Sequence, residues 1–213
     1  MNGIKFIFIG IFIIASSQIL AGEKLFDANR IYRDSDSAAQ SGRQGPGNKA
    51  EWRRKLNGWI MTHPKDAFAL SQRAYVRSIA GDFAGCEEDY LRALESADKK
   101  TVTYRHVLWS LGWSKFNMGD DKSAIDYWGQ AEQHHGGSPY WLPYTVSLAY
   151  WHLGEKELAL AYYGAAVKSD SAWGSPEKIE QKIHHWKARE KKVHGELFAE
   201  YLKRAEIVGQ AVE

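Results

Sequence analysis

The sequence predicts an all-α protein in which paired helices stack into an array. From residue 49 onward, apolar residues recur at the spacing of a helix face, and no run of alternating β-branched residues indicates a strand. Between the helical stretches, a glycine followed by an acid recurs at three places: Gly81-Asp82, Gly119-Asp120 and Gly154-Glu155. Internal repetition of this kind is typical of helical-repeat proteins.

Each of these glycines is expected to end one helix and begin a tight turn, because glycine adopts the left-handed conformation at little cost. The acid that follows favours the N-terminus of the next helix. Small and large residues then alternate in matching places. Five residues after each glycine there is a small residue: Cys86, Ala124 and Ala159. Nine residues after it there is a ring: Tyr90, Trp128 and Tyr163. Twelve residues after it there is an alanine: Ala93, Ala131 and Ala166. Seven residues before each glycine stand Ala74, Gly112 and Ser147. The small residues predict close helix crossings, and the rings predict what fills the space between successive pairs.

These positions resemble the tetratricopeptide repeat (TPR) family over residues 49–172. Trp52, Leu56, Trp59 and Pro64 match the second helix of an additional half repeat, in phase with a repeat that begins at Ala67. The resemblance implies an α-solenoid of antiparallel helix pairs. The repeats are divergent, because the turn glycines are 38 and 35 residues apart, whereas the family repeats every 34 residues.

The first helices of successive repeats line a concave groove in this family, and peptide ligands commonly lie in it. Carried onto this sequence, the groove positions are Phe68, Tyr75, His106, Trp109, Trp113, Phe116, Asn117, Trp141, Tyr144, Trp151 and His152. They are aromatic and lack the Lys and Arg clamp that some members use to hold an acidic tail. We therefore expect an apolar or aromatic-anchored protein or peptide partner. The alternative is that these rings pack against the protein itself, for example under its C-terminal helix.

Residues 173–213 predict an amphipathic C-terminal helix. Ser175-Pro176-Glu177 is a good helix start, and a break near Gly195 is an open alternative. The apolar face comprises Ile179, Ile183, Trp186, Val193, Leu197 and Tyr201. We expect this helix to cap the open end of the array. A basic helix that engages a membrane surface or an acidic partner is the alternative.

Residues 1–21 have the pattern of a secretory signal peptide. Lys5 precedes an apolar run from Phe6 to Ala15, and small residues lead to a cleavage site that we expect after Ala21. This run is shorter than the roughly 20 residues of a transmembrane helix, although an uncleaved anchor that extends to Leu20 is an alternative. We therefore expect a periplasmic or secreted protein, for which membrane contact is possible but not predicted.

Residues 22–48 show little periodicity and predict a flexible N-terminal segment, because residues 34–48 are dense in Ser, Gly, Gln and Asp.

The chain has 28 basic and 26 acidic residues, which argues against a nucleic-acid partner. Aromatic residues make up 13% of it, with nine Trp and eleven Tyr. Rings in that number either fill helix interfaces or line a recognition surface. The sequence does not indicate an oligomeric state.

No catalytic motif appears: the sequence has no phosphate loop, no nucleophile elbow and no paired cysteines. The pairs His134-His135 and His184-His185 are poor chelates, because adjacent helical residues point about 100° apart. Cys86 cannot form an intrachain disulfide, since it is the single cysteine, and its packing position predicts an inert thiol. We expect no enzyme activity, no metal and no cofactor.

Three functional hypotheses follow. The first is an adaptor that binds a protein partner and organises an assembly in the cell envelope. The second is an inhibitor or immunity protein that neutralises a toxic enzyme directed at the envelope. The third is a glycan-binding or carrier protein, which fits less well because polar residues that read hydroxyl groups are sparse among the groove positions.

Overall fold

The computed structural model of the chain describes residues 26–40 and 48–210, with side chains described up to residue 205. This part of the chain is all-helical and has no strand; a single isolated bridge joins Asp34 to Pro139. The helices run in the order α1 Ser37–Gln40, α2 Lys49–Thr62, α3 Ala67–Ile79, α4 Phe83–Ser96, α5 Val102–Met118, α6 Asp121–His135, α7 Leu142–His152, α8 Lys156–Ser169, the 3₁₀ helix η1 Ser171–Gly174, α9 Pro176–Ile183 and α10 Ala188–Gln210. The prediction of an all-α fold is confirmed for these residues. The predicted signal peptide, residues 1–21, lies outside them.

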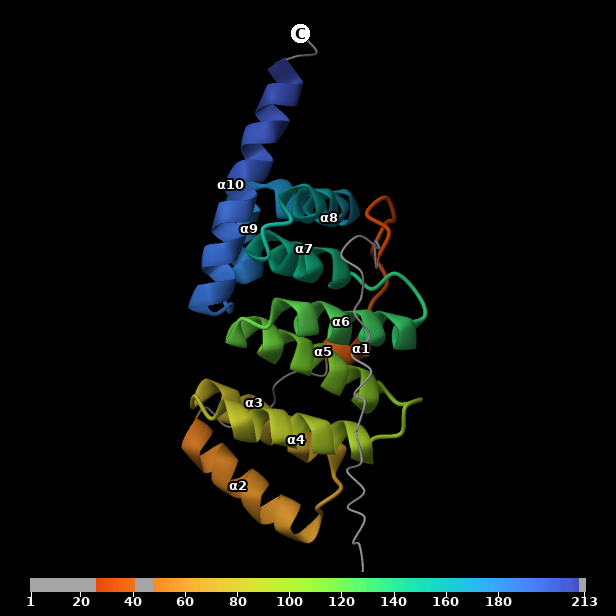
Figure 1. The fold of residues 1–213 in the computed structure, drawn as a ribbon, viewed down its shortest axis with the longest axis vertical. Coiled ribbons are helices and arrows are strands. Elements are labelled where there is room, and N and C mark those ends of the chain that lie inside the picture. Colours follow the sequence, from red (N-terminus) through yellow and green to blue (C-terminus); the bar gives the residue numbers. More distant parts are fainter. Residues whose placement is uncertain (1–25, 41–47, 211–213) are drawn as a thin grey trace, which may run out of the picture.

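The helices pack in adjacent pairs, α3 with α4, α5 with α6 and α7 with α8, and α2 packs against α3. Figure 1 shows these pairs one above another, with α2 at one end of the molecule and α8 toward the other. The turn glycines Gly81, Gly119 and Gly154 lie within the three pairs, at φ angles of 79°, 88° and 84°. Their predicted left-handed conformation is therefore confirmed.

Capping acids explain why helices begin directly after two of these glycines. The side chain of Asp82 accepts a hydrogen bond from Gly85 N at 3.0 Å, and that of Asp120 accepts one from Ser123 N at 3.3 Å. Each bond satisfies a backbone donor that the first turn of a helix leaves unpaired. The third acid, Glu155, makes no such side-chain bond.

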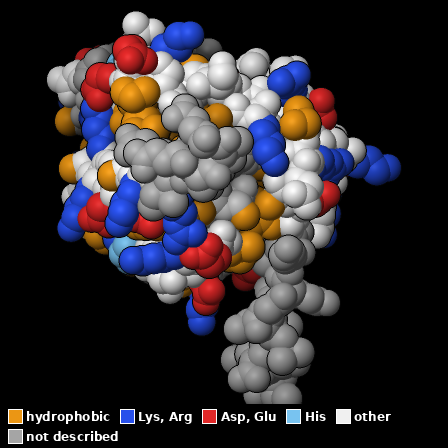
Figure 2. Space-filling model, turned by 90° about the horizontal axis from the view of Figure 1, so that it is seen from above, with side chains coloured by type: hydrophobic (Ala, Val, Ile, Leu, Met, Phe, Trp, Pro, Cys, Tyr) orange, Lys and Arg blue, Asp and Glu red, His pale blue; other side chains and the backbone are white. Residues whose placement is uncertain are grey.

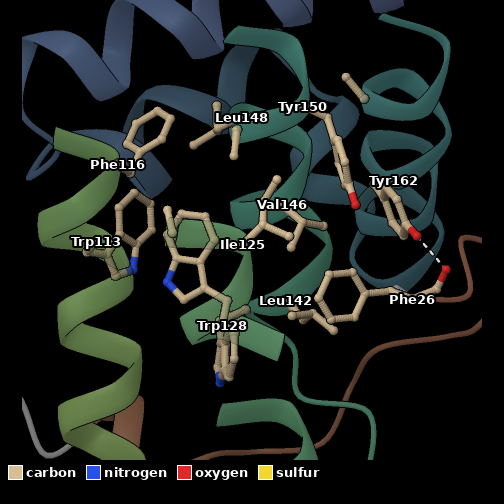
Figure 3. Close-up of a cluster of buried hydrophobic side chains, with 14 of the residues drawn as sticks. Phe26, Trp113, Phe116, Ile125, Trp128, Leu142, Val146, Leu148, Tyr150 and Tyr162 are labelled. Atoms are coloured by element: carbon tan, nitrogen blue, oxygen red, sulfur yellow. Dashed lines mark hydrogen bonds between the residues drawn. The ribbon is translucent and has the colours of Figure 1, made fainter. Parts of the chain in front are cut away.

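The predicted packing residues form the core. All nine residues that follow the turn glycines are at most 1% exposed: Cys86, Tyr90, Ala93, Ala124, Trp128, Ala131, Ala159, Tyr163 and Ala166. Figure 3 shows part of this core, with the Trp113 ring of α5 beside the Trp128 ring of α6, at a centroid distance of 5.2 Å. Small residues therefore bring the helices close, and rings close the space between pairs.

Residues 26–40, which the sequence placed in a flexible segment, are packed along the helices. Tyr32 and Asp36 are 1% and 0% exposed. Asp36 accepts hydrogen bonds from the Arg105 guanidinium at 2.8 Å and from Trp141 Nε1 at 2.9 Å. Tyr162 donates its hydroxyl hydrogen to the carbonyl of Phe26 (Figure 3). The expectation of flexibility is wrong for these residues, because burial of their rings and pairing of one carboxylate fix the segment.

The C-terminal part is broken at His184–Lys187, between α9 and α10, whereas Gly195 lies inside α10. α10 packs against α7 and α8, and α9 packs against η1. Figure 1 shows α10 running along one side of α7 and α8 and continuing past α8. Among the helices of residues 26–40 and 48–210, none combines the length and apolar character needed to cross a membrane.

Candidate functional site

The eleven predicted groove residues lie on the first helix of each pair: two on α3, five on α5, three on α7, and Trp141 directly before α7. Several of them form a continuous aromatic row from α3 to α5. The ring centroids of Phe68 and His106 are 5.9 Å apart, those of His106 and Trp109 6.3 Å, and those of Trp109 and Trp113 6.4 Å. Phe68 of α3 and His106 of α5, which are 38 positions apart in the sequence, thus belong to one aromatic row.

Four of the eleven residues are core residues rather than groove residues. Phe116 and Trp141 are 0% exposed, and His106 and Trp113 are 3% and 6% exposed. Trp141 bonds to Asp36 of the N-terminal segment, so that segment covers its indole. At these four positions the rings pack against the protein itself, which was the alternative to an open groove.

The C-terminal segment covers the α5–α7 half of the predicted groove. The Trp186 ring lies 5.8 Å from both the Trp113 and the Tyr144 rings, and Tyr144 stacks on Trp173 at 4.4 Å. A row of rings from the chain itself therefore occupies the place where a partner was expected in this half.

Polar contacts hold α10 in that position. Asp121, only 3% exposed, pairs with Arg189 at 3.2 Å and with His152 Nδ1 at 2.6 Å. Asn117 Nδ2 donates to Glu190 Oε1 at 2.8 Å, and Glu190 also accepts from Lys187 N at the start of the helix. Asn117 and Asp121 therefore orient the protein's own helix α10, and His152 pairs with the same Asp121 carboxylate.

The α3–α5 half of the predicted groove has exposed aromatic side chains. Phe68 is 39% exposed, Tyr75 and Trp109 are partly exposed, and so is Trp151 at the far rim on α7. Trp109 and Trp151 thus differ from Trp113, which the chain buries. The predicted groove is reduced to its α3–α5 half.

A small polar cavity lies in this half, and we call it the α3–α5 cavity. Its volume is about 10 Å³, which is room for one water molecule. It is lined by Ser71, Gln72, Tyr75, Tyr90, His106, Ser110, Trp113, Ser114, Asn117 and Lys187. The lining contains one cation, Lys187, whose Nζ lies 5.9 Å from the centre of the Tyr75 ring, and no carboxylate.

Hydrogen bonding defines the state of His106 beside this cavity. Its Nδ1 lies 2.7 Å from the carbonyl oxygen of Ala38, and a carbonyl only accepts, so Nδ1 carries the hydrogen. Its Nε2 lies 3.4 Å from the Ser110 hydroxyl oxygen, and it accepts this hydrogen bond when the ring is neutral. The two contacts fix the orientation of the His106 ring beside the cavity.

Two indole donors on α5 have no partner. The Nε1 atoms of Trp109 and Trp113 are buried, and neither has an acceptor within hydrogen-bond distance. A buried N–H without a partner costs about 1–3 kcal/mol. Trp186 covers Trp113, whereas the ring of Trp109 is partly exposed, so an external acceptor would gain most at Trp109.

Of the polar residues that line the cavity, sequence reasoning named Tyr75, His106 and Asn117 and missed the serines and Lys187. Ser110 and Ser114 follow His106 at intervals of four residues, so helical spacing alone could have placed them on the same face. Lys187 left no such signal, because it comes from the connection between α9 and α10 and reaches α3 only in the folded chain.

The other candidate groups have structural surroundings. Cys86 is buried, and burial raises the pKa of its thiol to about 11, which keeps it protonated at neutral pH. His134 packs edge-on against the Tyr104 ring at 4.9 Å. Within the described residues, no group of three His, Cys, Asp or Glu side chains is arranged to hold a metal ion.

No protein-family model matches this chain, and no curated protein is similar to it.

Proposed function

We propose that the protein is an exported, non-enzymatic scaffold of the tetratricopeptide type, which binds a protein or peptide partner in the cell envelope. Three observations support a solenoid of antiparallel helix pairs. The turn glycines are left-handed, the helices pack in adjacent pairs, and the small and large residues at matching places are all buried. Such arrays leave the first helices of the pairs available for recognition.

The partner surface in this proposal is the α3–α5 face, which we define as Phe68, Tyr75, Trp109 and the α3–α5 cavity. The observation that carries it is the partly exposed ring of Trp109, whose indole N–H has no hydrogen-bond acceptor. A backbone or side-chain carbonyl group of a partner would accept this hydrogen bond. Exposed aromatic rings next to it would supply the apolar area, as aromatic side chains do in interface hot spots.

Photo-crosslinking tests the proposal directly. A benzophenone amino acid in place of Phe68 is expected to give a specific adduct in cells, since Phe68 is 39% exposed on the α3–α5 face. The matched control is Phe83, which is 48% exposed on α4. Equal labelling from both positions, or none from position 68, would reject the α3–α5 face as the partner surface.

A second substitution tests the indole donor itself. Trp109→Phe keeps an aromatic ring and removes the N–H, so the adduct from position 68 should fall by roughly fivefold, the effect of one hydrogen bond worth about 1 kcal/mol. Trp59→Phe is the control, because Trp59 is an exposed indole on α2, whose Nε1 already bonds to Asp66. If Trp109→Phe leaves the adduct unchanged, the indole donors play no part in binding.

A further inference from the structure

The α3–α5 cavity brings polar side chains from four segments of the chain to one point. Three lining residues lie on α3, one on α4 and five on α5, and Lys187 reaches the cavity from the connection between α9 and α10. Helical spacing places the five residues of α5 on one side of that helix: His106, Ser110, Trp113, Ser114 and Asn117. The cavity is therefore a place where a bound group would join segments that are distant in the sequence.

Two buried side chains of this lining have no hydrogen-bond partner among the described residues. Gln72 is 2% exposed, and its side-chain amide forms no hydrogen bond with them. Trp113 is 6% exposed under Trp186, and its buried Nε1 has no acceptor. Buried polar groups are nearly always paired in folded proteins. Two such groups that line the same cavity indicate that a ligand belongs there.

Other donors of the lining are engaged within the chain. The Ser71 hydroxyl donates to a backbone carbonyl of its own helix at 2.8 Å. Asn117 Nδ2 donates to the carbonyl oxygen of Trp113 and to Glu190 Oε1, each at 2.8 Å. The N–H groups of Gln72 and Trp113 are therefore donors that a ligand in the cavity can use.

Lys187 makes the lining positively charged. Its Nζ lies 5.9 Å from the centre of the Tyr75 ring. Burial raises the pKa of the Cys86 thiol, and the charge of Lys187 opposes that rise, so this charge acts on the interior of the array. Glu190 lies outside the lining, and its two oxygens already accept from Asn117 Nδ2 and from Lys187 N at 2.8 Å. The cavity thus combines a cation with N–H donors and has no carboxylate in its lining.

This combination differs from the charged surface at the α10 end of the molecule. Figure 2 looks onto that end, where Lys and Arg side chains are interspersed with Asp and Glu. There Arg204 pairs with Glu157 at 2.7 Å, and Lys182 pairs with Asp170 at 2.6 Å. Basic residues at that end stand beside acids, whereas the lining of the cavity includes none.

We propose that the α3–α5 cavity binds a single small monovalent anion, which is chloride in ordinary solution. The N–H groups of Gln72 and Trp113 donate to the anion, and Lys187 balances its charge. The cavity volume of about 10 Å³ admits one particle of about the size of a water molecule. Water would fit as well, but a positive lining without a carboxylate favours an anion over a neutral ligand. The bound anion would fasten the α9–α10 connection to α3 and α5.

Anion binding to the purified chain tests this inference, and the absence of any partner in the sample keeps it separate from the partner proposed for the α3–α5 face. Chlorine NMR should show line broadening that saturates with chloride concentration. Tm should be higher in sodium chloride than in sodium gluconate of equal ionic strength, because gluconate is too large for the cavity and a ligand of the folded state stabilises it. Bromide in crystals should give an anomalous peak in the cavity. No broadening with equal Tm values, or bromide peaks only elsewhere, would overturn the proposal.

Substitution of the cation tests the location. Lys187→Gln should weaken chloride binding about tenfold, the effect of one hydrogen bond to a charged group. Lys192→Gln is the matched control, because it removes an exposed cation five residues further on in α10 and changes the net charge equally. It should leave chloride binding unchanged. Equal losses from both variants would show a general attraction to anions and refute the site.

A carboxylate placed in the lining should replace the anion. Gln72→Glu keeps the shape of the side chain and puts a negative charge beside Lys187, so its Tm should no longer depend on chloride. Trp113→Phe keeps the ring and loses the N–H, and it should weaken chloride binding about fivefold, which gives a second measurement if Gln72→Glu does not fold. A chloride dependence equal to that of the wild type in these variants would mean that the cavity holds only water.

Discussion

The indole of Trp128 lies directly against the backbone of Gly112: a Cβ atom at residue 112 would come within 2.5 Å of Trp128 Cδ1. Trp128 is fully buried in α6, and its Nε1 donates to the carbonyl oxygen of Trp109 at 3.2 Å. The ring therefore has little freedom to move. One glycine on the first helix thus sets how closely α5 and α6 approach.

Gly112→Ala should destabilise the protein by about 1–3 kcal/mol, the usual cost of forcing extra volume into a packed core. Urea unfolding followed by circular dichroism measures the change. The matched control is Gly164→Ala in α8, where a Cβ atom meets nothing within 4 Å. Alanine should be neutral or stabilising there, because it favours a helix by about 1 kcal/mol over glycine. Equal effects at both positions would contradict the close approach.

Ala131→Glu should unfold the α5–α8 region, because Ala131 is 0% exposed in α6 and has no space for a carboxylate. Loss of the cooperative thermal transition is the expected result. Ala161→Glu, at an exposed position of α8, is the control and should melt close to the wild type. A soluble Ala131→Glu protein with an unchanged Tm would show that the small-residue register is misassigned.

Stability should fall on mild acidification because of His194. Its imidazole is 2% exposed among Tyr163, Trp173, Trp186 and Phe198, and burial lowers its pKa from 6.5 to about 4. The Tyr163 hydroxyl donates to the carbonyl oxygen of Trp173, so it accepts from His194 Nε2 at 2.9 Å.

The unfolded chain binds a proton at this histidine near pH 6.5, whereas the folded chain does so only near pH 4. The contribution of neutral His194 is therefore complete above pH 6.5 and is lost progressively as the pH falls to about 4, by about 3 kcal/mol in total. Unfolding free energies of wild type and His194→Gln between pH 7 and pH 4 measure it. A parallel pH dependence of the two proteins would contradict this role.

Asp36 should hold the N-terminal segment on the helices. Hydrogen bonds from Arg105 and Trp141 keep the pKa of this buried carboxyl below its ordinary value. Asp36→Asn removes the charge opposite Arg105, whose side chain is 16% exposed, so we expect a loss of roughly 2–4 kcal/mol. Trypsin cleavage after Arg30 and Arg33 should become faster. Asp27→Asn is the control, because this exposed carboxylate of the same segment bonds locally to Asn29 N. It should change cleavage little, and a larger effect from Asp27→Asn than from Asp36→Asn would contradict the assignment.

Much of the helix arrangement follows from local sequence. Gly119 ends α5 in the left-handed conformation and Asp120 caps α6, and both facts depend on residues within one turn. The helix predicted around Trp52, Leu56 and Trp59 appears as α2, and the helix predicted to begin at Ala67 begins there as α3. The nine packing positions could be identified because helix periodicity and residue size decide burial within a pair.

The candidate site could be identified only in part. Phe68 and Trp109 lie on an exposed face as expected, whereas Trp141 is covered by Asp36 and Trp113 by Trp186. Those covering residues are 105 and 73 positions away. No local pattern marks either contact, since each depends on where a distant segment packs. The same reason explains why residues 26–40 were expected to be flexible.

The sequence by itself determined that this chain forms helices, where the pairs turn and which small and large residues pack between them, because these properties depend on backbone preference and helical spacing. Only the tertiary structure decided which aromatic rings stay exposed. That outcome depends on the N-terminal segment and α10 folding back over the array, and on buried partners such as Asp36 and Asp121 that hold them there.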